Sequence, residues 1–338
     1  MAEAGPDGSG NEKVSSRRAA ARSRRGEPPG PELFAGAEAR QTLGPHAATL
    51  DLPGLPIGIT GMDDASHAAF LARYAPYSVD SAAAGAPTPA LVLRASRARV
   101  ESFIEPPPPG VAEVNPVWTR VEQDTSGAGD FHIRLCTYHL AASFDTAGGI
   151  GHALFARDEP LRGENPVENL LRVALAWLAI TRGGILMHSA SIVRDERAFL
   201  FFGLSGAGKS TLSASSRKGR VISDDLSLLL PGDGRMEVVG SPFRGTYSGG
   251  APVTGRFPVA AAFSLSKSGA GEPDAVQPLP RSRAMAEAVA NLPFVVDQLH
   301  LSPSLLEGAE RALGSFPILG LRFRKGDTFW EAIEQANL

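Results

Sequence analysis

The sequence predicts an α/β fold in which a mixed sheet surrounds one glycine-rich loop. The first observation is the loop itself, Gly203 to Ser210, which fits the pattern G-x-x-x-x-G-K-[ST] at every fixed position. The second is the apolar run from Ala198 to Phe202 before it, which is typical of a buried strand. The third is a short helical segment followed at once by another strand, Arg220 to Ser223. This order of elements indicates a nucleotide-binding core.

The loop residues are suited to hold the phosphate groups of ATP. Glycines let the backbone turn so that successive N–H groups point at one anion, and the helix starting near Lys209 adds its positive end. We expect the Lys209 ammonium to reach the β- and γ-phosphates and the Ser210 hydroxyl to bind Mg²⁺. The residues predicted to bind ATP are Gly203, Leu204, Ser205, Gly206, Ala207, Gly208, Lys209, Ser210 and Thr211. A glycine-rich turn that binds nothing is the alternative, and the flanking strand and acids argue against it.

Two carboxylates, Asp224 and Asp225, follow the next strand. The chain between Lys209 and Asp224 has room only for a helix of about two turns and one short strand, so both carboxylates must lie near the loop. One of a carboxylate pair beside a nucleotide can hold magnesium while the other accepts the proton of an attacking hydroxyl. Consecutive side chains on a strand point in opposite directions, which allows this division of work. For either residue alone, a polar strand end without function is the alternative.

These motifs resemble the nucleotide site shared by HPr kinase/phosphorylase and ATP-dependent phosphoenolpyruvate carboxykinase. The resemblance rests on GLSGAGKST followed closely by ISDD, and FFGLSGAGKSTLS is most similar to the carboxykinase version. The pair Met187-His188 is similar to a Met-His pair that precedes the loop of HPr kinases at the same spacing. The chain also resembles more diverged HPr-kinase-like proteins of bacteria, in which HSAS-type and SPF-G-type segments flank the loop. The resemblance covers residues 186–245.

The resemblance implies a P-loop kinase core of the HPr kinase and carboxykinase type. It implies transfer of the γ-phosphoryl group of ATP to a hydroxyl, that of a serine in a protein or peptide. Lys209 and Ser210 are then the nucleotide and metal residues, Asp224 is the catalytic acid/base, and Asp225 is a carboxylate on the metal side. His188 is implied to be the partner that tunes Asp224, and a structural histidine at the edge of a strand is the alternative.

The chain departs from these families at three places. Thr211 stands where HPr kinases carry Glu, and the Arg-Gly-Leu-Gly-type signature of the phosphorylase activity is missing. Both departures argue against HPr itself as the acceptor and against the reverse reaction. Carboxykinases continue the paired aspartates into Glu-His-Gly-Trp, whereas this chain has Leu226-Ser227-Leu228, which argues against decarboxylation of oxaloacetate. Two alternatives stay open: a nucleotide-binding regulatory protein without turnover, and a carboxykinase-like enzyme acting on a small molecule.

Arg244 is a third candidate for the catalytic site. It lies in the segment Ser241-Pro242-Phe243-Arg244-Gly245, beyond the aspartates. Cations often contact the transferred phosphoryl group in such sites, so we expect Arg244 to do so here. An ion pair with a surface acid is the alternative.

Composition and length predict a soluble protein with room for two domains, or for one domain with a large N-terminal extension. The chain has 338 residues, of which 43% are hydrophobic, and a net charge of −3, so a nucleic-acid partner is not expected. No apolar run approaches the roughly 18 residues of a membrane helix, and a secretory hydrophobic region is absent, which predicts a cytoplasmic protein without a membrane partner. The single cysteine, Cys136, excludes an intramolecular disulfide and fits a reducing compartment. A homo-oligomer is compatible with the sequence.

Three regions are predicted along the chain. Residues 1–47 are rich in Gly, Pro, Ala and Arg and carry few large apolar side chains, so they cannot bury enough surface to offset their ordering entropy and should form a disordered basic tail. Residues 48–164 should form an N-terminal α+β region, with a helix at 65–74 and strands at 90–93 and 131–138. Residues 165–338 should form the nucleotide-binding domain.

Elements of the third region follow from capping and turn signals. Asn165 and Pro166 are a typical helix start, and the apolar residues of 167–178 recur at helical spacing. The charged turn 194–197 predicts a hairpin over 189–202, and Pro231 to Gly234 predicts a second hairpin. The other elements expected are strands at 185–188, 259–265 and 318–323 and helices at 210–216, 283–291, 304–313 and 328–336.

Overall fold

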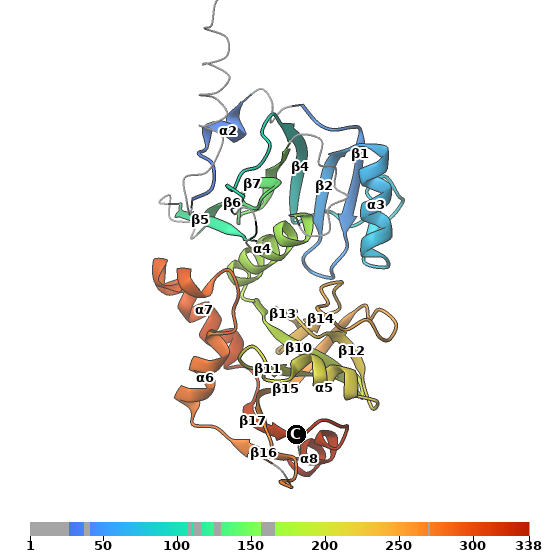
Figure 1. The fold of residues 1–338 in the computed structure, drawn as a ribbon, viewed down its shortest axis with the longest axis vertical. Coiled ribbons are helices and arrows are strands. Elements are labelled where there is room, and N and C mark those ends of the chain that lie inside the picture. Colours follow the sequence, from blue (N-terminus) through green and yellow to red (C-terminus); the bar gives the residue numbers. More distant parts are fainter. Residues whose placement is uncertain are drawn as a thin grey trace, which may run out of the picture. The chain divides into compact units, whose positions relative to one another are not determined.

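The computed structural model describes residues 27–36, 41–106, 108, 110, 116–124, 130–156, 166–269 and 271–337. The chain divides into two compact units. The first unit consists of Met1–Thr49, Ile57–Arg73 and Asp80–Leu171, and the second consists of Leu50–Pro56, Tyr74–Val79 and Arg172–Leu338. Each unit is built around one mixed sheet (Figure 1). The prediction of an α/β protein with a mixed sheet is therefore confirmed.

Within the described residues, one sheet has eight strands in the order β3-β1-β2-β4-β8-β7-β6-β5, and most of these strands belong to the first unit. β2, β4 and β8 run parallel to one another, whereas β5 to β8 pair antiparallel. The strands are β1 (His46–Leu50), β2 (Ile57–Met62), β3 (Ser78–Asp80), β4 (Leu91–Ala98), β5 (Trp118–Gln123), β6 (Phe131–Cys136), β7 (Leu140–Asp145) and β8 (Gly149–Ala156). The predicted helix at 65–74 is α3 (Asp64–Tyr74), and the strands predicted at 90–93 and 131–138 are β4 and β6.

The predicted tail is partly ordered. Residues 1–26 and 37–40 lie outside the described residues, and so does Asn165, the predicted helix cap. Helix α2 (Glu32–Ala35) lies inside the tail, and its Phe34 is only 8% exposed because it packs in an apolar cluster with Phe103 and Leu154. The prediction of disorder over 1–47 is corrected for this stretch, because Leu33 and Phe34 pack against an apolar cluster of the first unit.

Within the described residues, the sheet of the second unit has nine strands, seven of them in the order β12-β10-β11-β15-β14-β13-β9. β15 pairs parallel with β11 and β17, and β16 pairs antiparallel with β17. Both predicted hairpins are present, as β10–β11 and β13–β14. The strands are β9 (Ile185–Met187), β10 (Ser189–Arg194), β11 (Arg197–Phe202), β12 (Arg220–Ser223), β13 (Ser227–Pro231), β14 (Met236–Val239), β15 (Arg256–Lys267), β16 (Ala275–Pro278) and β17 (Ile318–Phe323).

Some of the helices in this part of the chain pack against the sheet. The helices are α4 (Pro166–Thr181), α5 (Lys209–Ser215), α6 (Arg281–Val289), α7 (Pro303–Leu313), α8 (Phe329–Gln335) and the 3₁₀ helix η2 (Val296–Leu301). The main apolar cluster joins α5 and α8 to the inner strands, with Phe201 stacked on Phe263 at 5.5 Å between ring centroids. Side chains alternate along β15, so Ser264 and Ser266 point away from this cluster, toward the face on which α6 packs.

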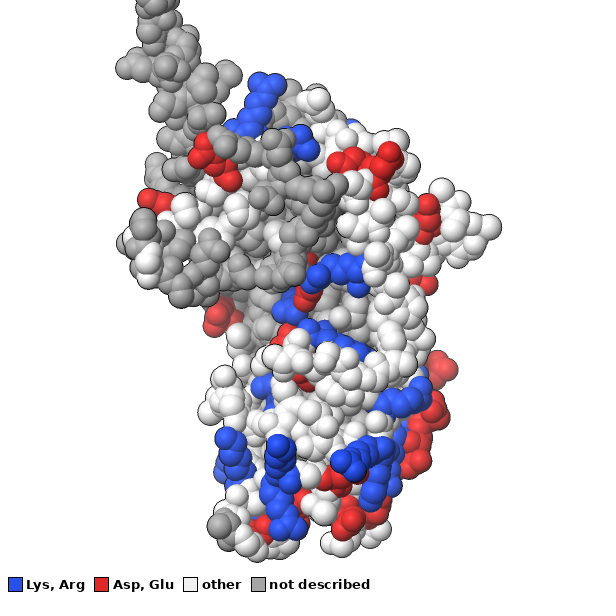
Figure 2. Space-filling view, turned by 45° about the vertical axis from the view of Figure 1, so that its right-hand side comes forward, with Lys and Arg blue, Asp and Glu red and all other residues white. Residues whose placement is uncertain are grey.

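The surface carries charges of both signs. Figure 2 shows lysine and arginine side chains interspersed with aspartate and glutamate on the face drawn. Among the residues that the structure describes, no helix is long and apolar enough to span a bilayer.

Candidate functional site

The glycine-rich loop joins β11 to α5, as the sequence predicted. Gly203, Gly206 and Gly208 have φ values of +150°, +78° and +109°, in a region that other residues rarely adopt. At Gly208 a Cβ atom would also lie 2.7 Å from Cζ of Phe323. The conformation of the loop therefore requires glycine at these positions, and Gly208 is closed to any side chain.

Lys209 opens helix α5 and folds back over the loop. Its residue is 8% exposed, and its Nζ donates a hydrogen bond to the carbonyl oxygen of Gly203 at 2.9 Å. Burial lowers the pKa of the Lys209 ammonium, while the negative charge of Asp225 acts in the opposite direction. The ammonium is thus held above the loop, where an anion bound by the loop N–H groups would meet it.

Asp224 is buried against the segment that follows β14. The residue is 2% exposed, and its Oδ1 accepts a hydrogen bond from the N–H of Gly245 at 2.7 Å. Its Oδ2 accepts from the N–H groups of Thr246 and Tyr247, both at 3.1 Å. Consecutive backbone N–H groups of this kind stabilise a negative charge. The carboxylate therefore fixes residues 245–247 beside the loop.

Asp225 points to a different set of partners. Its Oδ1 lies 3.2 Å from Nδ1 of His188, and its Oδ2 lies 3.2 Å from a terminal nitrogen of Arg172. Burial alone would raise the pKa of the Asp225 carboxyl, but the hydrogen bond from His188 and the charges of Arg172, His188 and Lys209 outweigh it, so the pKa lies below its ordinary value. Asp225 is therefore held as a carboxylate among cationic groups.

The structure differs from the sequence-based prediction in the partner of His188, and it adds Arg172 to the site. His188 was expected beside Asp224, whereas its Nδ1 lies next to Oδ1 of Asp225. The reason is the opposite direction of consecutive side chains, which turns Asp224 to residues 245–247 instead. Arg172 was missed, although the sequence carries a signal: it is the one cation in α4 and stands directly before the apolar run Val173 to Ile180.

A cavity of about 340 Å³ brings most predicted residues together. It is lined by His188, Ser205, Gly206, Gly208, Lys209, Ser210, Thr211, Asp224, Asp225, Gly245 and Thr246. The lining is polar and combines loop N–H groups, an ammonium and two carboxylates. Such a set is suited to phosphate groups and a hard cation, since it offers donors to the anion and oxygen ligands to the metal.

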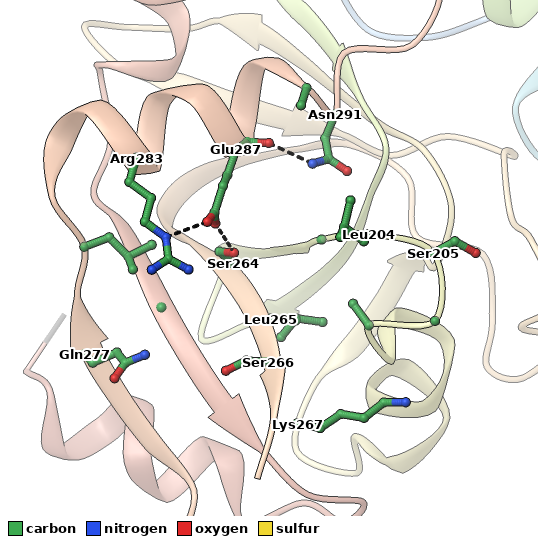
Figure 3. Close-up of a pocket in the computed structure, with 16 residues that line it drawn as sticks. Leu204, Ser205, Ser264, Leu265, Ser266, Lys267, Gln277, Arg283, Glu287 and Asn291 are labelled. Carbon is green, nitrogen blue, oxygen red and sulfur yellow. Dashed lines mark hydrogen bonds and ion pairs between the residues drawn. The ribbon is translucent and has the colours of Figure 1, made fainter.

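A second cavity, of about 560 Å³, lies on the other side of the loop. The remaining loop residues, Gly203, Leu204 and Ala207, line it together with β15 and α6. Figure 3 shows Arg283 and Glu287 reaching from α6 toward Ser264, with Gln277 at another side. The two cavities share Ser205 and Gly206.

Arg244 lines neither of these two cavities. Its guanidinium donates hydrogen bonds to the carbonyl oxygens of Ile222, Gly249 and Ala251 at 3.2, 3.0 and 3.1 Å, and to two others. It also lies 5.6 Å from the ring centroid of Tyr247. The geometry favours a structural role over the predicted contact with the phosphoryl group, because these donors are engaged by the main chain.

No group of three or more His, Cys, Asp or Glu side chains within the described ranges could hold a metal alone. Magnesium in nucleotide sites takes one or two protein carboxylates and completes its shell with phosphates and water. Ser210 and Asp225 fit this role, since both line the polar cavity.

Comparison with known families gives one match. A sequence model of the phosphoenolpyruvate carboxykinase family matches residues 168–232. This segment holds His188, the whole glycine-rich loop and both aspartates. No curated protein matches the chain. The match indicates a carboxykinase-like, ATP-binding segment and an ATP-using, phosphotransferase-like activity, and it covers a minority of the 338 residues.

Proposed function

We propose that this protein is an ATP-dependent phosphotransferase that moves the γ-phosphoryl group of Mg·ATP to a hydroxyl. The acceptor implied by the resemblance to HPr kinases is a serine of a protein or peptide. The observation that carries the proposal is the polar cavity, which joins Lys209, Ser210, Asp224 and Asp225 at one loop. A nucleotide-binding protein without turnover would have no use for both carboxylates there.

Each residue has a role that its surroundings support. The loop N–H groups bind the phosphates, and Lys209 compensates their charge. Asp225 has a lowered pKa and stays ionised, so it is the carboxylate for the metal side together with the Ser210 hydroxyl. When bound, Mg²⁺ supplies neutralisation of the charge that develops on the phosphates.

Asp224 is the proposed acid/base. The N–H groups of residues 245–247 hold its carboxylate in one orientation at the edge of the cavity, and the hydroxyl of the acceptor transfers its proton there. His188 and Arg172 position Asp225. Arg244 keeps residues 249–251 against β12 and acts only through that segment.

A carboxykinase-like enzyme acting on a small molecule is the second candidate. It is favoured by the family match over residues 168–232. The continuation of the aspartates into Leu226-Ser227-Leu228 still argues against oxaloacetate as its substrate.

The test is binding of Mg·ATP by Lys209→Ala. We expect the nucleotide Kd to rise at least tenfold, because loss of a charge-assisted hydrogen bond removes about 1.5–3 kcal/mol. Isothermal titration calorimetry measures it, and circular dichroism checks the fold. Lys218→Ala, on an exposed part of the same unit, is the matched control. Equal ATP affinity of Lys209→Ala and the parent would refute the proposal.

A further inference from the structure

The second cavity has the properties of a binding site for a polar molecule. Its volume of about 560 Å³ lies within the roughly 300–1,000 Å³ of small-molecule sites. Its lining combines apolar residues, among them Leu265, Leu279 and Ala290, with polar and charged ones. A molecule in it would contact the backbone of the loop directly.

The second cavity adjoins the polar cavity, because the two share Ser205 and Gly206 of the loop. Asn291 lines it, and the carbonyl oxygen of Asn291 accepts a hydrogen bond from the N–H of His188 at 2.7 Å. His188 in turn contacts Asp225. Ser210 and Thr211, at the other end of the loop, do not line it. A molecule in the second cavity would therefore lie next to phosphates bound at the loop, and its hydroxyl would have to extend past Ser205 and Gly206 to reach Asp224 in the polar cavity.

The charged residues of the lining favour an anion. Glu287 is engaged by its neighbours: its carboxylate accepts from the Ser264 hydroxyl at 2.5 Å and from Nε of Arg283 at 2.7 Å. The two terminal nitrogens of Arg283 form no hydrogen bond with the described residues, and the side chain, 65% exposed, stands at the mouth of the cavity. Lys267 is a second cation in the lining. A guanidinium with two adjacent donors binds a carboxylate in a bidentate manner.

We infer that the second cavity binds the phosphoryl acceptor, and that this acceptor carries a carboxylate beside its hydroxyl, which Arg283 recognises. The inference rests on the proposed function. The cavity admits a molecule of residue or sugar-acid size, so the acceptor is a serine in an extended acidic peptide or a free hydroxy acid, not a serine on a flat protein surface. Both sources offer the same chemistry to Arg283.

The experiment compares acidic and neutral acceptors in matched pairs. The probes are a peptide with the sequence Glu-Ser-Glu against one with Gln-Ser-Gln, and D-glycerate against glycerol. The proteins are the parent, Arg283→Gln, and Arg281→Gln as the matched control, because Arg281 is an exposed residue of the same helix outside the cavity. Phosphoryl transfer gives KM for each acceptor, and calorimetry gives Kd for Mg·ATP.

We expect the acidic member of at least one pair to have the lower KM by about tenfold or more, the effect of a hydrogen bond between charged groups. Arg283→Gln should abolish that preference with the Kd for Mg·ATP unchanged, and Arg281→Gln should keep it. The pair that shows the preference identifies the source. Equal KM values within both pairs, or a preference that survives in Arg283→Gln, would overturn the inference.

A nucleoside in the cavity is the competing occupant. In that case Arg283→Gln would raise the Kd for Mg·ATP and leave the preference among acceptors as in the parent, and the inference would fail. A parent that binds no Mg·ATP would instead refute the proposed function, which calorimetry detects without any acceptor.

Discussion

Asp224 and Asp225 are neighbours in sequence with opposite surroundings. Asp224 accepts hydrogen bonds from backbone N–H groups, whereas Asp225 lies among His188, Arg172 and Lys209. Removing the negative charge of Asp224 leaves only neutral N–H groups without their acceptor, whereas removing that of Asp225 leaves cationic side chains without their counter-ion. Substituting each carboxylate by its amide therefore tests how the two divide the work.

We predict that Asp224→Asn keeps Mg·ATP binding while phosphoryl transfer falls about 10²–10⁴-fold, the effect of a lost general base. Asp225→Asn should instead raise the Mg²⁺ concentration needed for half-maximal rate, because a metal ligand is lost. A magnesium titration of both variants measures this, with ATP hydrolysis as the readout until the acceptor is known. Asp233→Asn, in the exposed β13–β14 turn, is the control.

The pair of variants also reveals a reversed assignment. If added magnesium restores the activity of Asp224→Asn but not that of Asp225→Asn, then Asp224 is the metal ligand and Asp225 is the acid/base. The amide in Asp224→Asn also places an NH₂ group opposite N–H donors, so its free energy of unfolding should fall by about 1–3 kcal/mol. Urea unfolding separates that loss from the loss of rate.

The segment that follows β14, residues 244–251, connects the predicted site to the sheet. Arg244 joins residues 249–251 to Val221 and Ile222 of β12, so one guanidinium holds two parts of the chain together. The same segment supplies the N–H groups that hold Asp224. Its position therefore depends on Arg244 at one end and on Asp224 at the other.

Arg244→Lys should loosen this segment. A lysine keeps the charge but has no planar fork, so the free energy of unfolding should fall by about 2 kcal/mol. Amide hydrogen exchange of residues 245–251 should become faster, with Arg235→Lys in the exposed hairpin turn as control. Unchanged exchange together with a large loss of phosphoryl transfer would support the contact with the phosphoryl group predicted from the sequence.

At the scale of elements, apolar runs with clear ends could be predicted and alanine-rich or glycine-containing strands could not. β12 and β17 have the predicted bounds, because turn residues flank each run. β7, with the sequence LAASFD, and β8, with GIGHALFA, were missed, since few β-branched residues mark them and glycine suggests a turn. Packing in the sheet decides their conformation, and local sequence does not carry that information.

The site was predictable where its residues share one motif. Spacing brings Lys209, Asp224 and Asp225 together, because strand, loop and helix leave little freedom between them. Asn291 and Arg283 come from the later helical part of the chain, and only the tertiary fold brings them to the loop. The backbone N–H groups of residues 245–247 could not be predicted either, because every residue type except proline has such a group.

At the scale of the whole molecule, the second unit is discontinuous. Leu50–Pro56 and Tyr74–Val79 belong to it although most of it follows Arg172. The hydroxyl of Tyr77 donates to the carbonyl oxygen of Val253 at 3.1 Å and accepts from its N–H at 3.0 Å. Burial raises the pKa of this phenol against the opposing effect of Arg244. The early segment is therefore tied into the later unit by specific polar contacts.

Tyr77→Phe should lower the free energy of unfolding by about 1–3 kcal/mol, since it leaves a buried N–H and a carbonyl without their partner. Urea unfolding followed by tryptophan fluorescence measures it, because Trp330 lies in the core of the same unit. Tyr138→Phe, in the first unit, is the matched control. A Tyr77→Phe variant as stable as the parent would show that the ring alone holds the segment.

This discontinuity bears on the order in which the protein is made. A ribosome releases Tyr77 long before Val253, which is 176 residues further along the chain. The second unit cannot close during early synthesis, whereas most of the first is complete once Leu171 has emerged. The apolar side chains of Leu50–Pro56 and Tyr74–Val79 therefore stay exposed until the later strands of the second unit have been synthesised. Nascent chains stalled in this interval are the species in which a chaperone would find its binding site.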